Sequence, residues 1–245
     1  MDVRKTINFV PSYFHNSIPM KKIYLISLTV ILFCLTATQA NAQLALGLKG
    51  GWTRTSIDRT NLGRIDESYS SLNGFDLGIQ THYSITDWLA LRVDVDYMKR
   101  SHRMDRNLPI VSKVYTEYRN DYLMLPVMAD FSFGGKLLRG HLLCGGYGGY
   151  WLKARVKGTS FTSVFTEHFF QDFDDNHEFT SEDQRLTVGL AGGIGLTADV
   201  HEHIGINIDA LYYYDLVSYH NDYAHMKDPR YLDTFSITMG VYYKF

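Results

Sequence analysis

Eight charged or titratable side chains stand out because each lies in an alternating stretch, on the side opposite to the apolar residues. They are Lys49, Asp76, His82, Arg92, Asp94, Asp96, Asp130 and Asp209. If the strands enclose an interior and these side chains point into it, they form a salt-bridged network with more carboxylates than cations. Such a network is either a packed polar plug or a narrow path for protons or cations. We expect the plug, because a small barrel leaves little room for a pore.

The sequence also offers histidines and hydroxyl groups that could act as base and nucleophile, which acyl transfer requires in contact with each other. The histidines are His168, His177, His220 and His225, and the serines are Ser160, Ser163 and Ser218. No spacing singles out one pair, so these residues are available by composition alone. We therefore predict no catalytic residues and a chain that is not an enzyme.

The segment 156–184 is acidic and rich in phenylalanine. Against Lys157 it carries Glu167, Asp172, Asp174, Asp175, Glu178, Glu182 and Asp183. Asp172-x-Asp174-x-Asn176 begins like a calcium loop, but His177 stands where that loop needs glycine and Asp183 where it needs glutamate. We therefore expect a solvated segment that binds divalent ions weakly or contacts a basic partner. Its rings indicate a protein-contact surface or strand extensions beyond a membrane: Phe161, Phe165, Phe169, Phe170, Phe173 and Phe179.

Two further motifs fail the test of their context. His201-Glu202-His203 places two imidazoles two residues apart in a short turn, with no third ligand nearby in the sequence, so it is not built like a zinc site. Gly193-x-Gly195-x-x-Ala198 matches the loose dinucleotide fingerprint, but no helix follows it, which favours strand glycines. We expect neither a metal site nor a cofactor.

The elements that must position these residues are strands, because apolar residues alternate with polar or small ones with period 2. Seven stretches show this clearly: 44–49, 75–83, 89–97, 123–133, 186–196, 204–214 and 235–245. An eighth, 141–153, is glycine-rich and has no clear parity. All but the first of these runs cover 9 to 13 residues, and a tilted strand needs roughly 9 to 11 to cross the hydrocarbon layer. Eight such strands predict an antiparallel up-and-down transmembrane β-barrel.

The connections alternate in length. Short turns are expected at 84–87, 134–138 and 199–202, and long polar segments at 55–71, 99–114, 156–184 and 217–231. Short turns at one end and long loops at the other are the layout of an outer-membrane barrel, with the turns and both termini in the periplasm.

Aromatic residues cluster near the predicted strand ends. Tyr83, Trp88, Phe133 and Tyr243 fall toward the short turns, and Trp52, Tyr97, Trp151 and Tyr214 toward the long loops. Such rings favour the boundary between hydrocarbon and water, so the pattern predicts two aromatic girdles. Cys144 is expected to be a small buried apolar residue.

The N-terminal part has the pattern of an export signal. Met20-Lys21-Lys22 precedes the apolar run Ile23–Leu35 and the small residues Ala40 and Ala42, which predicts a signal peptide at 20–42. Residues 1–19 would then be an extension ahead of the true start at Met20, and 43–245 the exported barrel. Removal of residues 1–42 leaves 20 basic against 25 acidic side chains, a formal charge of −5, which disfavours nucleic acid as a partner.

Four stretches resemble a known family, the eight-stranded outer-membrane β-barrels of the PorT type, common in Bacteroidetes. They are Leu44 to Gly51, Tyr122 to Val127, the run Gly145-Gly146-Tyr147-Gly148-Gly149-Tyr150, and Gly240 to Phe245. The resemblance covers residues 43–245 and implies a barrel in the bacterial outer membrane. Tyr243 and Phe245 look like the C-terminal signal read by the barrel-insertion machinery. The family has no catalytic signature to carry over.

These observations together predict a non-enzymatic outer-membrane barrel with a structural or interaction role through its extracellular loops. The expected partners are outer-membrane lipid and lipopolysaccharide, the barrel-insertion machinery, and a surface or secretion-system protein. The first alternative is an accessory component of a protein secretion or surface-assembly system. The second is an enzyme that modifies lipid A.

Overall fold

The computed structural model describes residues 44–59, 67–108, 111–135, 137–164, 167–180, 183–218 and 230–245. The predicted extension 1–19 and the predicted signal peptide 20–42 lie outside these residues. The strands of the structure are β1 (Leu44–Arg59), β2 (Glu67–Ser84), β3 (Leu89–Leu108), β4 (Val111–Gly134), β5 (Leu138–Val164), β6 (Glu167–Asn176), β7 (Leu186–His201), β8 (Ile204–Asp215) and β9 (Arg230–Lys244). Among the described residues, no helix has the length and apolar character needed to cross a bilayer.

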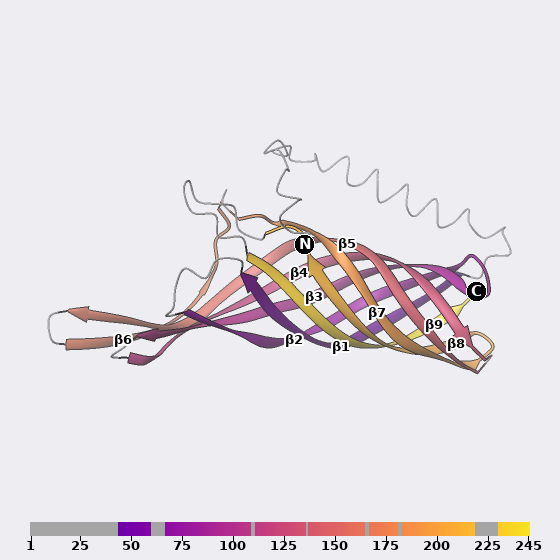
Figure 1. The fold of residues 1–245 in the computed structure, drawn as a ribbon, viewed down its shortest axis with the longest axis horizontal. Helices are drawn as coiled ribbons and strands as arrows, with labels where there is room; N and C mark the ends of the chain where they lie inside the picture. The colour runs from indigo at the N-terminus through magenta and orange to yellow at the C-terminus, as the bar shows by residue number, and fades with distance from the viewer. Residues whose placement is uncertain are drawn as a thin grey trace. The chain divides into compact units, whose positions relative to one another are not determined.

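Eight of the strands form a closed ring (Figure 1). Antiparallel neighbours follow in the order β4-β3-β2-β1-β9-β8-β7-β5, and β5 also pairs with β4. The first and last strands meet where Ala45 lies opposite Lys244 and the Phe245 amide donates to the Leu44 carbonyl at 2.9 Å. Closure gives backbone amides a partner in hydrocarbon, where water offers none. The predicted eight-stranded antiparallel barrel is confirmed.

The three short connections predicted from the sequence join β2 to β3, β4 to β5 and β7 to β8. In the β4–β5 turn, Gly134 has a φ of 128°, a conformation that side chains with a Cβ rarely adopt. The Gly135 amide donates to the Leu138 carbonyl at 3.1 Å and closes this turn. At this end of the barrel, the three connections between neighbouring strands are therefore all short turns.

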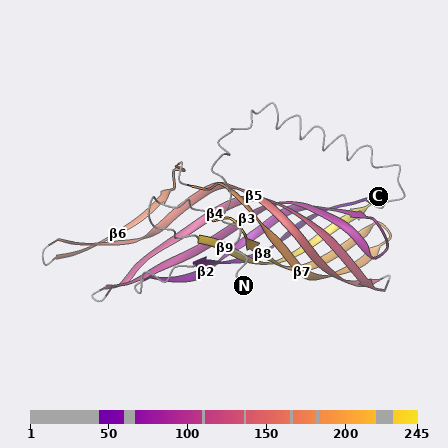
Figure 2. The ribbon, with the colours of Figure 1, turned by 45° about the horizontal axis from the view of Figure 1, so that its top comes forward.

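At the opposite end, the prediction of long loops at 55–71, 99–114 and 156–184 was largely wrong. The arms of these segments are strand: β3 and β4 remain paired out to Leu108 opposite Val111. β6 pairs with the outer half of β5, from Arg155 opposite Asn176 to Val164 opposite Glu167. In the figures, β6 and this half of β5 project together beyond the ring (Figure 1; Figure 2). Polar residues on both faces hid most of these strands, because the sequence signal was an apolar face. For 156–184, the strand extensions indicated by its phenylalanines are confirmed.

The apolar residues of the alternation face outward. Leu48 is 69% exposed and Ile194 64%, and the same face of β9 exposes Ile237, Met239 and Val241. A soluble protein would bury this face, so a belt of exposed aliphatic side chains around a closed sheet is typical of a barrel that contacts lipid. Trp88, Phe133 and Tyr243 are exposed near the short turns, and Trp52 is exposed toward the other end.

Two residues of the glycine-rich strand β5 do not lie where we expected them. Trp151 is 4% exposed and stacks inside the barrel on Tyr122, with ring centroids 5.9 Å apart, so it does not belong to the predicted girdle. Cys144 is exposed rather than buried. Both errors have one cause: the glycines of 141–153 left the parity of this strand unreadable, and its odd residues, such as Leu143 and Tyr147, face inward.

The exposure of Cys144 gives a direct test of the lipid-facing surface. It shares its face of β5 with Leu142, which is also exposed, so a bilayer should cover the thiol. In intact vesicles, a membrane-soluble maleimide should label Cys144, and a charged maleimide should label it only after solubilisation. Cys144→Ala is the control for labelling elsewhere. Equal labelling by the charged reagent in vesicles would contradict the assignment of this face to lipid.

Candidate functional site

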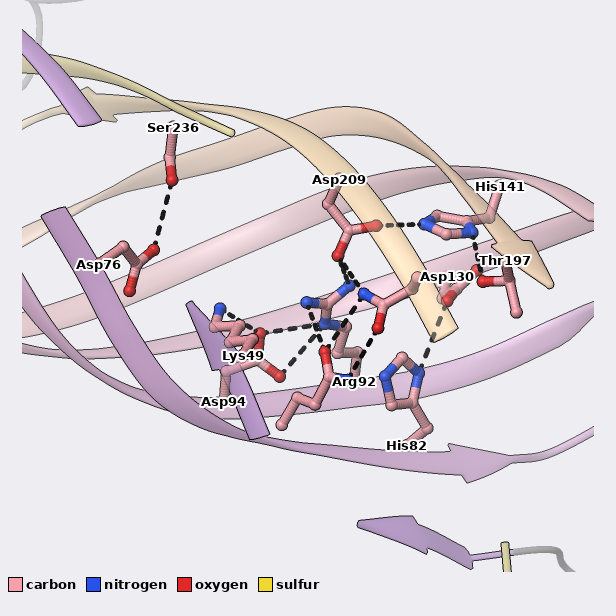
Figure 3. Close-up of polar contacts among 12 residues, drawn as sticks. Lys49, Asp76, His82, Arg92, Asp94, Asp130, His141, Thr197, Asp209 and Ser236 are labelled. Carbon is pink, nitrogen blue, oxygen red and sulfur yellow. Dashed lines mark hydrogen bonds and ion pairs between the residues drawn. The ribbon is translucent and has the colours of Figure 1, made fainter. Parts of the chain in front are cut away.

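Arg92 lies at the centre of the barrel and joins three strands (Figure 3). Its Nη1 donates to Asp209 of β8 at 2.6 Å, its Nε to Asp94 of its own strand at 3.0 Å, and its Nη2 to Gln80 of β2 at 3.3 Å. All four side chains are fully buried. A buried guanidinium is tolerated only when its donors are matched, and this one has carboxylates on two sides.

Lys49 extends the network from β1. Its Nζ lies 2.7 Å from Asp94 and 2.8 Å from Asp96, and these side chains have no solvent exposure. Asp76 lies deeper toward the long-strand end and accepts from Ser236 of β9 at 3.3 Å. Carboxylates outnumber cations here, as the sequence indicated. The structure thus brings Lys49, Arg92, Asp94, Asp96 and Asp209 into one ion-pair cluster.

On the short-turn side of this cluster lie two histidines. The His141 Nε2 is 2.6 Å from Asp209, and its Nδ1 is 3.1 Å from the Thr197 hydroxyl. Hydroxyl, imidazole and carboxylate follow one another as in an acyl-transfer site. His141 and Asp209 are almost fully buried, whereas Thr197 is partly exposed. His82 lies 3.8 Å from Asp130, which accepts from Ser132 at 3.2 Å. His82 and Asp130 thus form a second, looser pair.

Small residues make the space for these side chains. Gly240 of β9 lies beside the Gln80–Asn207 pair, whose amides are joined at 2.8 Å. A Cβ on Gly240 would lie 2.5 Å from the Gln80 Nε2 and 2.6 Å from the Asn207 Oδ1. A larger residue here would have to displace these two buried side chains, and no unusual backbone conformation of Gly240 is involved.

A third polar layer, nearer the long-strand end, was missed by the sequence reasoning. Arg100 donates to Asp215 at 2.9 Å, to Thr234 at 2.9 Å and to the Leu232 carbonyl. Tyr147 also donates to Asp215. Arg100 falls within the predicted loop 99–114, because the apolar face of its strand ends at Tyr97. The signal that would have found it is the inward parity of Arg92, Asp94 and Asp96, which continues without a break through Arg100.

Apolar side chains fill the interior between these layers. Met98, Met124, Met128, Leu143, Leu211 and Tyr213 form part of one buried cluster. The lumen is therefore not lined only by glycine and charge, and the described interior side chains pack against one another. Close packing of this kind favours a rigid plug over a water-filled path.

The remaining predicted residues lie on strands or turns with local partners. In β6, Asp172 accepts from the Thr159 hydroxyl at 2.6 Å, and Asp174 pairs with Arg155 at 2.6 and 2.8 Å. The hydrogen bond from the Arg155 guanidinium holds the pKa of Asp174 below its usual range. In the described part of the chain, no group of three potential metal ligands occurs. Gly193 and Gly195 lie within β7.

Other candidates lie in the turn between β7 and β8, on the lipid-facing surface, or in the outer hairpin, which is formed by β6 and the outer half of β5. His203 lies in the turn between β7 and β8, and its ring is 3.2 Å from the Lys244 carbonyl of β9. Tyr243 and Phe245 face outward. His177 lies 3.0 Å from Asp183, and Ser160 donates to the Gln171 carbonyl at 3.1 Å. His220 and His225 lie outside the described residues.

Removal of Arg92 should destabilise the barrel strongly. Arg92→Met leaves Asp94 and Asp209 buried without their guanidinium, which costs about 3–5 kcal/mol of unfolding free energy. The measurement is guanidinium-induced unfolding in lipid vesicles. Arg139→Met is the control, because Arg139 forms a half-exposed pair with Asp199 at 2.9 Å and such a pair contributes about 1 kcal/mol or less. Equal losses in the two variants would contradict the central role of Arg92.

The match to a protein-family model agrees with this geometry. The family model described as "Outer membrane protein beta-barrel domain" matches residues 25–245, and no curated protein matches the chain. Among solved structures, OprG from Pseudomonas aeruginosa is 14% identical, with 82% of this chain and 95% of that chain covered and a TM-score of 0.47. Neisserial surface protein A is 16% identical, with 82% and 99% covered and a TM-score of 0.43. The protease OmpT from Escherichia coli is 10% identical, with 83% and 96% covered and a TM-score of 0.37.

Identities this low say nothing about a shared role. The match to the family model, however, spans every strand from β1 to β9. The chain therefore belongs to the family of outer membrane proteins with a β-barrel domain, and its location is the bacterial outer membrane.

Proposed function

We propose that this barrel is a membrane-anchored binding protein without enzymatic activity, which presents a preformed β-sheet to a protein partner at the cell surface. The observation that carries the proposal is the ten-residue ladder between β5 and β6, which stands beyond the ring. A bare membrane anchor needs no such ladder. Binding surfaces on membrane barrels are built from the segments on the side with the long connections.

The outer sheet has five strands. β2 pairs with β3 from Glu67 to Ser71, β3 with β4 out to Leu108, β4 with β5 out to Thr159, and β5 with β6. Side chains reinforce the ladder: the Arg103 guanidinium lies 4.1 Å from the centre of the Tyr115 ring, and His102 stacks on Tyr118 at 4.9 Å. A surface that is already ordered loses little conformational entropy on binding.

The last strand of this sheet, β6, provides backbone groups and exposed side chains that a partner could bind. Among the described strands, β6 pairs with β5 alone, so its other edge carries backbone groups without a strand neighbour. Exposed strand edges accept extended segments of other chains. Phe170 is exposed on β6 beside acidic residues such as Asp172 and Asp175. These features favour an extended, basic partner segment with an apolar side chain.

A second proposal is the role of an accessory component in protein secretion or surface assembly. Its support is the resemblance of Leu44–Gly51, Tyr122–Val127 and the C-terminal residues to PorT-type barrels. Deletion of the gene followed by analysis of secreted proteins separates the two: a loss of secreted cargo supports this role, and unchanged secretion with altered adhesion supports the first proposal.

Shortening the β5–β6 hairpin tests the first proposal. Lys157 lies opposite Asp174, so residues 158–173 can be replaced by Asn-Gly, which forms a two-residue hairpin turn. The variant should insert normally, as shown by its mobility on gels before and after heating, but lose the cross-linked complex that the intact protein forms on living cells. Phe170→Ala, which keeps the ladder, should weaken that complex. A complex of unchanged yield with the shortened hairpin would contradict the proposal.

A plugged barrel should also be electrically silent. Because Arg92, Arg100 and their partners are fully buried among packed side chains, the pure protein in planar bilayers should show no steady ion current. An ion-selective current that Asp94→Asn abolishes would instead establish the interior as a cation or proton path.

A further inference from the structure

β5 contains one extra residue at the height where the apolar belt ends. Tyr122 of β4 lies opposite Trp151, and the preceding residue, Asp121, lies opposite Lys153, so Leu152 has no partner in the register. Such a bulge re-aims the side chains that follow it. As a result Leu152 and Lys153 both face outward, whereas regular alternation would turn Lys153 into the barrel.

Beyond the bulge, two arginines face each other across neighbouring strands. Arg119 of β4 lies directly opposite Arg155 of β5, and their side chains are 50% and 56% exposed on the outer face. Like charges in such pairs destabilise a sheet. Arg119 pairs with Glu117, two residues away on its own strand, at 3.0 Å, and Arg155 pairs with Asp174 of β6.

A lysine adds to this charge one row closer to the belt. Lys153 is exposed and, within the described part of the chain, forms no ion pair. Its neighbour Asp121 lies 3.2 Å from Lys99 on the other side. Arg119, Lys153 and Arg155 therefore form an exposed basic triad, and each of its guanidinium groups has more N–H donors than its carboxylate partner accepts.

The height of the basic triad identifies what it meets. Immediately below it, Leu123 and Tyr150 lie opposite each other and are 44% and 39% exposed, as part of the lipid-facing belt. Lys153 lies one residue beyond the exposed Leu152, Arg155 lies three residues beyond it, and Arg119 lies four residues from Leu123, which corresponds to roughly 3–13 Å along a strand. This is the level at which a lipid carries its headgroup, and the acyl chains of the same molecule would cover the belt.

We propose that the basic triad Arg119–Lys153–Arg155 binds the phosphate of a phosphorylated lipid in the outer leaflet. Arginine forks and an ammonium group are the side chains that hold phosphate oxygens by charge-assisted hydrogen bonds. A phosphate between Arg119 and Arg155 converts their repulsion into attraction to a shared anion. The site is independent of the protein partner proposed for β6.

Lys157 provides a matched control. It lies on the same strand and face as Lys153 and Arg155, but its neighbours in the register are Glu117 and Asp174, both acidic. It also lies one further row from the belt than Arg155. If overall positive charge were enough, Lys157 would contribute as much as Lys153.

The experiment uses the folded protein in phosphatidylcholine nanodiscs with lipid A, either bisphosphorylated or enzymatically dephosphorylated, and measures lipid retention by native mass spectrometry. The intact protein should bind the phosphorylated form at least about ten-fold more tightly. Arg119→Gln with Lys153→Gln should abolish this preference, and Lys153→Gln alone should reduce it. Arg155 is retained in both variants because it also holds β6 through Asp174.

Lys157→Gln should leave the preference unchanged. Equal retention of the two lipids by the intact protein, or a loss with Lys157→Gln as large as with Lys153→Gln, overturns the proposal. Displacement of the lipid by millimolar inorganic phosphate alone would assign the triad to a free anion and overturn the lipid source. Gel mobility before and after heating verifies that each variant is folded.

Discussion

Hydrogen bonding of the backbone in a medium without water is the constraint on which the rest of this structure depends. Every amide at membrane height must pair within the sheet, so the sheet has to close. β1 meets β9 and β4 meets β5 for this reason. Eight strands enclose only a narrow space, and an outward face that contacts lipid leaves all polar side chains at this height to that space. Fold, lipid belt and crowded interior are thus consequences of one requirement.

The narrow interior imposes a second constraint, on charged side chains. Charges removed from water must find opposite charges or hydrogen-bond partners, and Arg92 and Arg100 each bridge strands that lie far apart in the sequence. These bridges tie β3 to β8, across the barrel from one half of the chain to the other. The buried cluster around Met98, Leu143 and Leu211 fills the space between the polar layers. The plug therefore gives the ring a defined cross-section in addition to filling it.

Periodicity predicted the ring because seven strands have one apolar face, and the short turns supplied the topology. It did not predict the outer sheet, since strands such as β6 carry polar residues on both faces and no alternation in hydropathy. Only the phenylalanines of 156–184 indicated strand extensions there. The glycines of β5 concealed which of its residues face inward, so the sequence predicted the wrong environment for Trp151 and Cys144. The inward charges were identified from parity, but their pairing was not, because a partner such as Asp209 lies more than a hundred residues from Arg92. Cross-strand register, which aligns Arg119 with Arg155, depends on one bulge that no local pattern reveals.

The unbroken course of β5 has a mechanical consequence. Its 27 residues run from the short turn at one end of the ring to the tip of the outer hairpin, a span of about 90 Å for an extended strand. A tensile load applied at the tip would act parallel to the strand axis. It would be shared in shear by the ladders to β4 and β7, whose hydrogen bonds would have to rupture together rather than one at a time. The outer hairpin is thus continuous with a strand of the barrel. A pulling force on it from outside the cell is transmitted directly to the membrane-embedded strands.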